Sequence, residues 1–312
     1  MTKEDEGTGG SSGETSGGML GRAIEVMQAE AYKDAPWLLQ QLDKEQGTAY
    51  SLHLQRAYAP HGLDTALATA ELLEPTDDFP MPKHSPSRLQ DPWAYAAMRL
   101  LWIHVDRMAA RRGDSLEAQP LLGTLPTGQL NARAIYVPET GETGILFDDE
   151  IRVMAYLLSK VVAEILTDPE KSDEDHVEID LKRVYHPLRY APRAVEWFGA
   201  MLDSYLYHGW IRILPSWVIG QTAHRLALIL CTGFEHFVMG HEYGHLARRH
   251  LHGDFHPLLD GLPGVTEEVI SRSQEVEADA YGLMIACDDA MRELGTPLPG
   301  FWGAYLACKA FG

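Results

Sequence analysis

The sequence predicts an α+β fold that is mostly helical. Apolar residues recur at helical spacing in five long segments, at 93–112, 151–166, 194–207, 219–251 and 271–294. Two short runs, 131–137 and 144–147, are instead typical of strands, and the residues between them have turn chemistry. We therefore expect a small sheet that is accompanied by many helices.

The chain is expected to have three parts. Residues 1–18 are acidic and rich in glycine and serine, so they cannot bury apolar surface and are predicted to be a disordered tail. Residues 19–130 are predicted to form a helical region, interrupted by a proline-rich linker at 74–92. Residues 131–312 contain the predicted strands and the longest helical pattern, and are predicted to form the second domain.

Composition restricts the classes of function. The formal net charge is -19, which repels phosphate backbones and makes a nucleic acid an unexpected partner. The three cysteines form no CxxC pair, which indicates a reducing compartment. The N-terminus lacks the pattern of a secretory signal, and no run approaches the roughly 18 to 20 apolar residues that cross a bilayer. We expect a cytoplasmic protein with no membrane partner.

One motif carries recognisable chemistry. It is His241-Glu242-Tyr243-Gly244-His245, an HExxH pattern inside the predicted helix 219–251. Because an α-helix turns about 100° per residue, His241 and His245 lie on one face and can bind the same metal ion. Glu242 lies to the side of that face, where it can reach a water molecule without binding the metal. The alternative is two solvent-facing histidines on an ordinary helix, which the apolar run before the motif disfavours.

A catalytic zinc ion takes three protein ligands and keeps one open position. Glu275 is the preferred third ligand, because Asp279 lies four residues later on the same helical face. Asp279 could then accept the free ring N–H of a ligating histidine. Glu277 faces another direction and is the alternative ligand.

Histidines that follow the motif remain open as ligands. They are His250, His252 and His256. The metzincin pattern is excluded, because Arg248 and Leu251 stand where that pattern has glycine and histidine.

The two helices together resemble the gluzincin metallopeptidases. The HtpX-like and ImmA/IrrE-like peptidases pair an HExGH helix with a downstream E-x-x-A-[D/N] helix, as His241–His245 and Glu275–Asp279 do here. The resemblance covers roughly residues 131–290. It implies a zincin-like metallopeptidase domain at 131–312 that binds one Zn²⁺ per chain through His241, His245 and Glu275.

The resemblance also implies an activity, that of a zinc metalloendopeptidase acting on a peptide or protein substrate. Glu242 would be the general base. Candidates for the donor that stabilises the oxyanion are Tyr243, Tyr281, His252 and His256. The predicted strands at 131–137 and 144–147 could bind an extended peptide along an exposed edge.

Two other readings compete. A catalytically silent pseudo-peptidase could serve as a scaffold that binds a regulatory partner protein through the N-terminal helices, but such a scaffold has no use for Glu242. A di-iron oxidase needs two Glu-x-x-His pairs. The sequence supplies one, Glu242 to His245.

Overall fold

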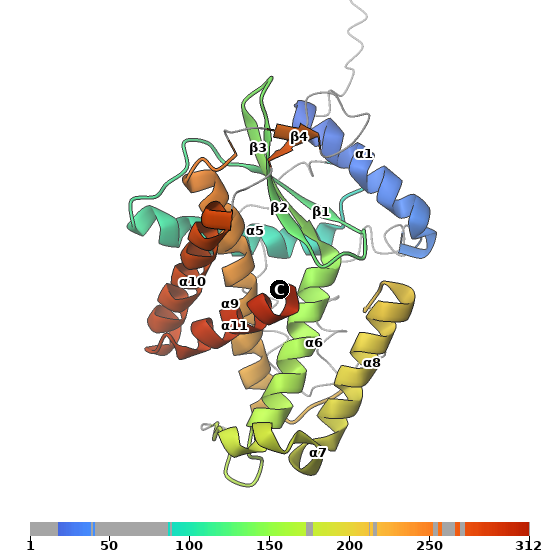
Figure 1. The fold of residues 1–312 in the computed structure, drawn as a ribbon, viewed down its shortest axis with the longest axis vertical. Coiled ribbons are helices and arrows are strands. Elements are labelled where there is room, and N and C mark those ends of the chain that lie inside the picture. The colour runs from blue at the N-terminus through green and yellow to red at the C-terminus, as the bar shows by residue number, and fades with distance from the viewer. Residues whose placement is uncertain are drawn as a thin grey trace, which may run out of the picture.

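The computed structural model describes residues 18–38, 40, 87, 89–172, 177–211, 213–214, 217–251, 255–257, 266–268 and 272–311. These residues form a mostly helical structure with a small mixed sheet (Figure 1), which confirms the predicted α+β fold with mostly α content. Of the predicted tail only residue 18 is described, and of the predicted linker only 87 and 89–92. Both therefore stay predictions.

Among the described elements, three groups of helices are separated along the chain by two groups of strands. The helices are α1 (Met19–Asp34), α5 (Pro92–Arg111), α6 (Asp149–Leu166), the 3-10 helix η2 (Leu181–Tyr185), α7 (Pro187–Tyr190), α8 (Pro192–His208), α9 (Gln221–Ala247), α10 (Arg272–Leu294) and α11 (Leu298–Phe311). The strands are β1 (Leu121–Leu125), β2 (Ala132–Val137), β3 (Glu142–Asp148), β4 (Phe255–Pro257) and β5 (Thr266–Glu268). None of the described helices combines the length and apolar character that a membrane span requires.

The sheet has the strand order β1-β3-β2-β5-β4. The two predicted strands are β2 and β3, which pair as an antiparallel hairpin, and the turn between them places Gly141 at φ 71°, a conformation that glycine adopts readily. Strand β1 runs parallel to β3. Strand β5 pairs with β2 at a single described position, Tyr136 with Thr266.

Strand β1 is absent from the sequence prediction. It lies within the region 19–130, which was expected to be helical, and it pairs with a strand on the far side of residue 130. The run Leu121-Leu-Gly-Thr-Leu125 is short, contains a glycine and shows no alternation, because four of its five residues are buried. Its strand conformation depends on the distant partner β3.

Both faces of the sheet are buried, since consecutive side chains of a strand point to opposite sides. On β3, Ile145 and Phe147 pack against α5 and α9, while Leu146 between them packs against α1. Figure 1 shows α1 on one side of the three longer strands and the helical body on the other. Each such side chain contributes roughly 1.5–3 kcal/mol when it is fully buried. The sheet is thereby fixed relative to α9.

Helix α9 occupies the centre of the helical body. It contacts α5, α6, α10, α11 and β2. Its residues are buried on nearly every side, which explains the apolar run that precedes the HExxH motif.

Close contacts with α10 and α11 require glycine. A Cβ on Gly282 of α10 would lie 2.5 Å from the carbonyl oxygen of Phe237, and one on Gly303 of α11 would lie 2.5 Å from the backbone nitrogen of Phe234. The backbones of the three helices are therefore in direct contact.

We predict that Gly282→Ala destabilises the protein by roughly 1–3 kcal/mol, because the added methyl group meets the backbone of α9, which cannot yield. Chemical denaturation measures the free energy of unfolding. The control is Gly199→Ala on α8, where an added Cβ has no neighbour within 4 Å. That change should stabilise the helix by roughly 0.5–1 kcal/mol. Equal effects of the two substitutions would refute the close-contact argument.

Candidate metal centre

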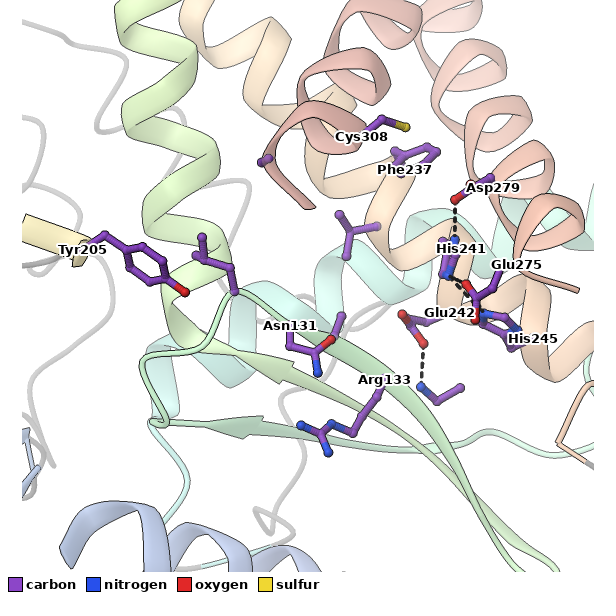
Figure 2. A pocket seen from close by; sticks show the side chains of 15 residues that line it. Asn131, Arg133, Tyr205, Phe237, His241, Glu242, His245, Glu275, Asp279 and Cys308 are labelled. Carbon is purple, nitrogen blue, oxygen red and sulfur yellow. Dashed lines mark hydrogen bonds and ion pairs between the residues drawn. The ribbon is translucent and has the colours of Figure 1, made fainter. Parts of the chain in front are cut away.

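Two helices bring three ligand atoms together. His241 and His245 project from the last turns of α9, and Glu275 projects from the first turn of α10. Figure 2 shows the three side chains pointing toward one another. They form a group of metal-ligating residues whose ligand atoms all lie within 4.8 Å of one another.

The spacing of these atoms fits a tetrahedral zinc ion. His241 Nε2 and His245 Nε2 are 3.0 Å apart, and Glu275 Oε2 lies 3.3 Å from the first and 3.8 Å from the second. Three ligands at tetrahedral angles, each about 2.0–2.1 Å from zinc, would be about 3.3 Å apart. The measured distances bracket that value, so the residues present fit the metal that the sequence pattern implies.

Asp279 holds the ring of His241 from the other side. Its Oδ1 lies 2.9 Å from Nδ1 of His241, one helical turn beyond Glu275 (Figure 2). A carboxylate can only accept, so Nδ1 carries the proton and Nε2 presents its lone pair to the metal position. This is the arrangement that the four-residue spacing of Glu275 and Asp279 predicts.

The pKa values of the two histidines are shifted in opposite directions. Burial acts to lower the pKa of His241, but its hydrogen bond to Glu275 and the charges of Glu242 and Asp279 outweigh burial and raise that pKa to about 9. Burial and the neighbouring charge of His241 lower the pKa of His245 to about 4. His241 is therefore the more basic member of the pair, and its Nε2 lies 3.0 Å from Nε2 of His245.

Glu242 is held by the sheet and faces the same cleft. Its carboxylate is buried, and Oε2 accepts a hydrogen bond from the backbone N–H of Ala134 on β2 at 2.5 Å (Figure 2). Burial raises the pKa of Glu242 to about 7, partly offset by the charge of His241 and the hydrogen bond from Ala134. Glu242 is not a member of the three-ligand group. This placement is consistent with a base beside the metal position.

The site opens into a cleft of about 670 Å³. Residues from β2 and the segment just before it, and from α8, α9, α10 and α11, line it: Leu130, Asn131, Ala132, Arg133, Ala134, Tyr205, Phe237, Val238, His241, Glu242, His245, Glu275, Asp279, Cys308 and Ala310. Polar groups lie at the metal position, and the side chains of Phe237 and Val238 provide apolar surface beside it.

One wall of the cleft is the beginning of β2, on the side of the strand where β5 pairs with Tyr136 further along. The N–H of Asp148 donates to the carbonyl of Asn131 at 2.9 Å, so the backbone groups of Asn131 and Arg133 face β3. Backbone groups alternate in direction along an antiparallel strand. Those of Ala132 and Ala134 therefore face the cleft. These backbone groups lie beside the ligand group, and the predicted binding of an extended peptide stays a prediction.

The structure does not bring Tyr243 and Tyr281 to the cleft, which corrects their prediction as oxyanion donors. Both are almost fully buried, and their rings stack with centroids 5.9 Å apart. The hydroxyl of Tyr243 lies 2.9 Å from the carbonyl oxygen of Asp114 and 3.1 Å from the carboxylate of Asp106, either of which can accept its one proton, on the side of α9 away from the cleft. The other candidates remain untested: His252 lies outside the described residues, and of His256 only the backbone is described.

Glu277 and His250 are not ligands in this arrangement, although both were kept as alternatives. His250 Nε2 lies 3.2 Å from Glu277 Oε2, and His250 Nδ1 lies 3.0 Å from Nδ1 of His245. Both ring nitrogens of His250 are therefore engaged away from the metal position. Arg248 lies 3.4 Å from the other oxygen of Glu277.

Sequence reasoning missed several residues of the cleft. Tyr205 lies at the end away from the histidines, and Cys308 lies near Phe237 and Asp279 (Figure 2). Both come from helices, α8 and α11, that are far in sequence from the motif. Nothing in their local patterns indicates the cleft, because only the packing of these helices places them there.

Comparison of the chain with protein-family models, with curated protein sequences and with solved structures gives no match. An assignment of function therefore depends on the side-chain geometry.

We predict that Asp279→Ala weakens zinc binding by roughly 10- to 100-fold, because His241 loses the partner that fixes its tautomer and orientation. Competition with a zinc-sensitive chelator measures the dissociation constant. The control is Asp288→Ala on the same helix, which removes a carboxylate that pairs with Arg112 at 2.6 Å. That variant should bind zinc like the wild type. An equal loss in both variants would show that general charge, and not the contact with His241, is responsible.

Proposed function

We propose that the protein is a zinc-dependent metallopeptidase of the gluzincin type. One observation carries the proposal: the ligand atoms of His241, His245 and Glu275 converge at distances of 3.0, 3.3 and 3.8 Å, which suit one tetrahedral zinc ion. Two imidazoles and one carboxylate form a donor set that is typical of zinc sites, whereas magnesium and calcium prefer oxygen ligands. Three protein ligands leave a fourth position open, as catalytic zinc sites do.

Glu242 supports an enzyme over a scaffold. Zinc bound at this site would polarise the scissile carbonyl and activate water. Glu242 lines the same cleft, and its pKa of about 7 suits a group that takes a proton from water and returns it to the leaving amine near neutral pH. Its hydrogen bond to Ala134 holds the carboxylate in one orientation. A structural metal site has no need of such a group.

The edge of β2 supports a peptide as the substrate. The N–H and carbonyl of Ala132 and the carbonyl of Ala134 face the cleft and can pair with an extended chain, while the N–H of Ala134 is held by Glu242. Such pairing recognises a peptide backbone without regard to its side chains. A chain that lies along this edge passes the ligand group, because Ala134 contacts Glu242 directly. A peptide or protein is therefore the proposed substrate class.

The metal content of the purified protein tests the first half of the proposal. We expect about one zinc ion per chain by elemental analysis, and loss of most of it in His241→Ala and in His245→Ala. His208→Ala, which removes an exposed histidine at the end of α8, should retain the metal. Full retention of zinc by both ligand variants would end this assignment.

Glu242→Gln tests whether the site is catalytic. The amide can still accept the hydrogen bond from Ala134, but it cannot act as a base. The variant should fold, keep its zinc and hydrolyse a diverse peptide library roughly 10²- to 10⁴-fold more slowly than wild type, as followed by mass spectrometry.

The control for this experiment is Glu235→Gln on the same helix, whose carboxylate pairs with Arg152 at 2.9 Å. It should leave hydrolysis unchanged. Loss of zinc in Glu242→Gln would make Glu242 a ligand and contradict the geometry. A fully loaded wild type that cleaves nothing would favour the silent scaffold.

A further inference from the structure

We propose that His250 and Glu277 form a hydrogen-bonded relay that holds His245 in the tautomer and orientation required of a metal ligand. The inference rests on the proposed metal centre. It assigns a positioning role to two residues that lie outside the ligand group, and it explains why the second ligand histidine needs no carboxylate of its own.

The backbone at the end of α9 brings His250 to His245. The N–H of His250 donates to the carbonyl of His245 at 2.9 Å, and the N–H of Arg249 donates to that of Leu246 at 3.1 Å. These two bonds define a Schellman motif, in which the chain turns back and the second residue beyond the helix cap packs against the third residue from its end. An apolar pair usually fills that contact. Here the pair is His250 and His245, with ring centroids 5.2 Å apart.

Arg249 is held in an unfavourable conformation to make this turn. Its φ is 56°, and among the described residues it is the one non-glycine with positive φ. The left-handed region is uncommon for residues with a Cβ, and it persists where the surroundings impose it. Arg249 occupies the position after the helix cap, where glycine is the most common residue. The turn is nevertheless formed, and it places the ring of His250 beside the metal site.

The chemistry of the three groups fixes the direction of each hydrogen bond. Glu277 as a carboxylate can only accept, so Nε2 of His250 donates to it across 3.2 Å. A neutral imidazole then has its lone pair on Nδ1, and Nδ1 of His250 accepts from Nδ1–H of His245 across 3.0 Å. His245 is left with its lone pair on Nε2, the atom that faces His241 and Glu275. This is the tautomer that can bind a metal.

Burial and charge stabilise the relay. The ring of His250 is 5% exposed, so an unpaired ring nitrogen there would be costly. Arg248 lies 3.4 Å from the second oxygen of Glu277, and this contact helps to orient the carboxylate toward His250. Hydrogen bonding of this kind also raises the basicity of a metal-bound imidazole and limits its rotation.

The relay makes the two ligand histidines equivalent. His241 reaches a carboxylate directly, at Asp279, while His245 reaches one through His250, at Glu277. Both carboxylates lie on α10 within one turn of the ligand Glu275. Helix α10 thus supplies the ligand Glu275 and also the two carboxylates that orient the ligand histidines.

The experiment compares His250→Phe with His250→Gln. Phenylalanine fills the space but makes no hydrogen bond, and we expect zinc affinity to fall roughly 10- to 100-fold. Glutamine can accept from His245 with its carbonyl oxygen and donate to Glu277 with its amide, so it should restore most of the affinity. In the His250→Phe background, Glu277→Ala should add no further loss, although it weakens binding when made alone.

A metal-free readout separates positioning from bulk stability. In protein labelled with ¹⁵N at histidine, NMR of the wild type should show the proton of His245 on Nδ1. His250→Phe should give a mixture of tautomers, and His250→Gln should return the Nδ1 form. A residue that merely fills space would not restore one tautomer through glutamine.

Three results would overturn the proposal. Wild-type affinity in His250→Phe would remove the relay and leave the metal centre intact. Equal loss in His250→Phe and His250→Gln, with equal loss of thermal stability, would make His250 a packing residue. A wild type that binds no zinc would overturn both the metal centre and the relay that rests on it.

Discussion

The close packing of α9 against α10 determines where the three ligand side chains lie relative to one another. Gly240 and Gly282 meet at the crossing, and Gly244 lies against Tyr281 one turn further on. Because no side chain separates the helices, α10 comes near enough for Glu275 to reach both histidines. Any bulk at the crossing would move the ligand and both carboxylate anchors together, since all three share the first turns of α10.

With the helices packed in this way, the hydrogen bonds around the site leave only acceptor atoms facing its centre. The Nδ1 atoms of His241 and His245 are both occupied, by Asp279 and by His250. Two Nε2 atoms and a carboxylate oxygen therefore face one another across 3.0 to 3.8 Å. Such a set of acceptors repels itself unless a proton or a metal ion lies between its members. The raised pKa of His241 reflects the same demand for positive charge.

Features with local sequence signals could be predicted, and features that depend on distant contacts could not. Helical periodicity located α9 and α10, and the four-residue spacings placed His241 with His245 and Glu275 with Asp279 on common faces. Strand β1 was not predicted because its partner, β3, is distant in the sequence. The five-residue spacing of His245 and His250 does not predict their contact within a continuous helix. The contact forms because α9 ends between the two residues. The hydroxyl of Tyr243 turned away because burial against Tyr281 left it partners at Asp106 and Asp114 and none in the cleft.

The sheet contributes to the site through one hydrogen bond. Glu242 lies on the central helix, but its carboxylate is oriented by Ala134 of β2, and β2 is fixed in turn by side chains buried on both faces of the sheet. A buried carboxylate without this donor would have no partner on that side. The same strand offers the backbone groups of Ala132 to the cleft. In a metallopeptidase, the base and the substrate would therefore be positioned by one rigid element, while the ligands are positioned by another, and α9 joins the two.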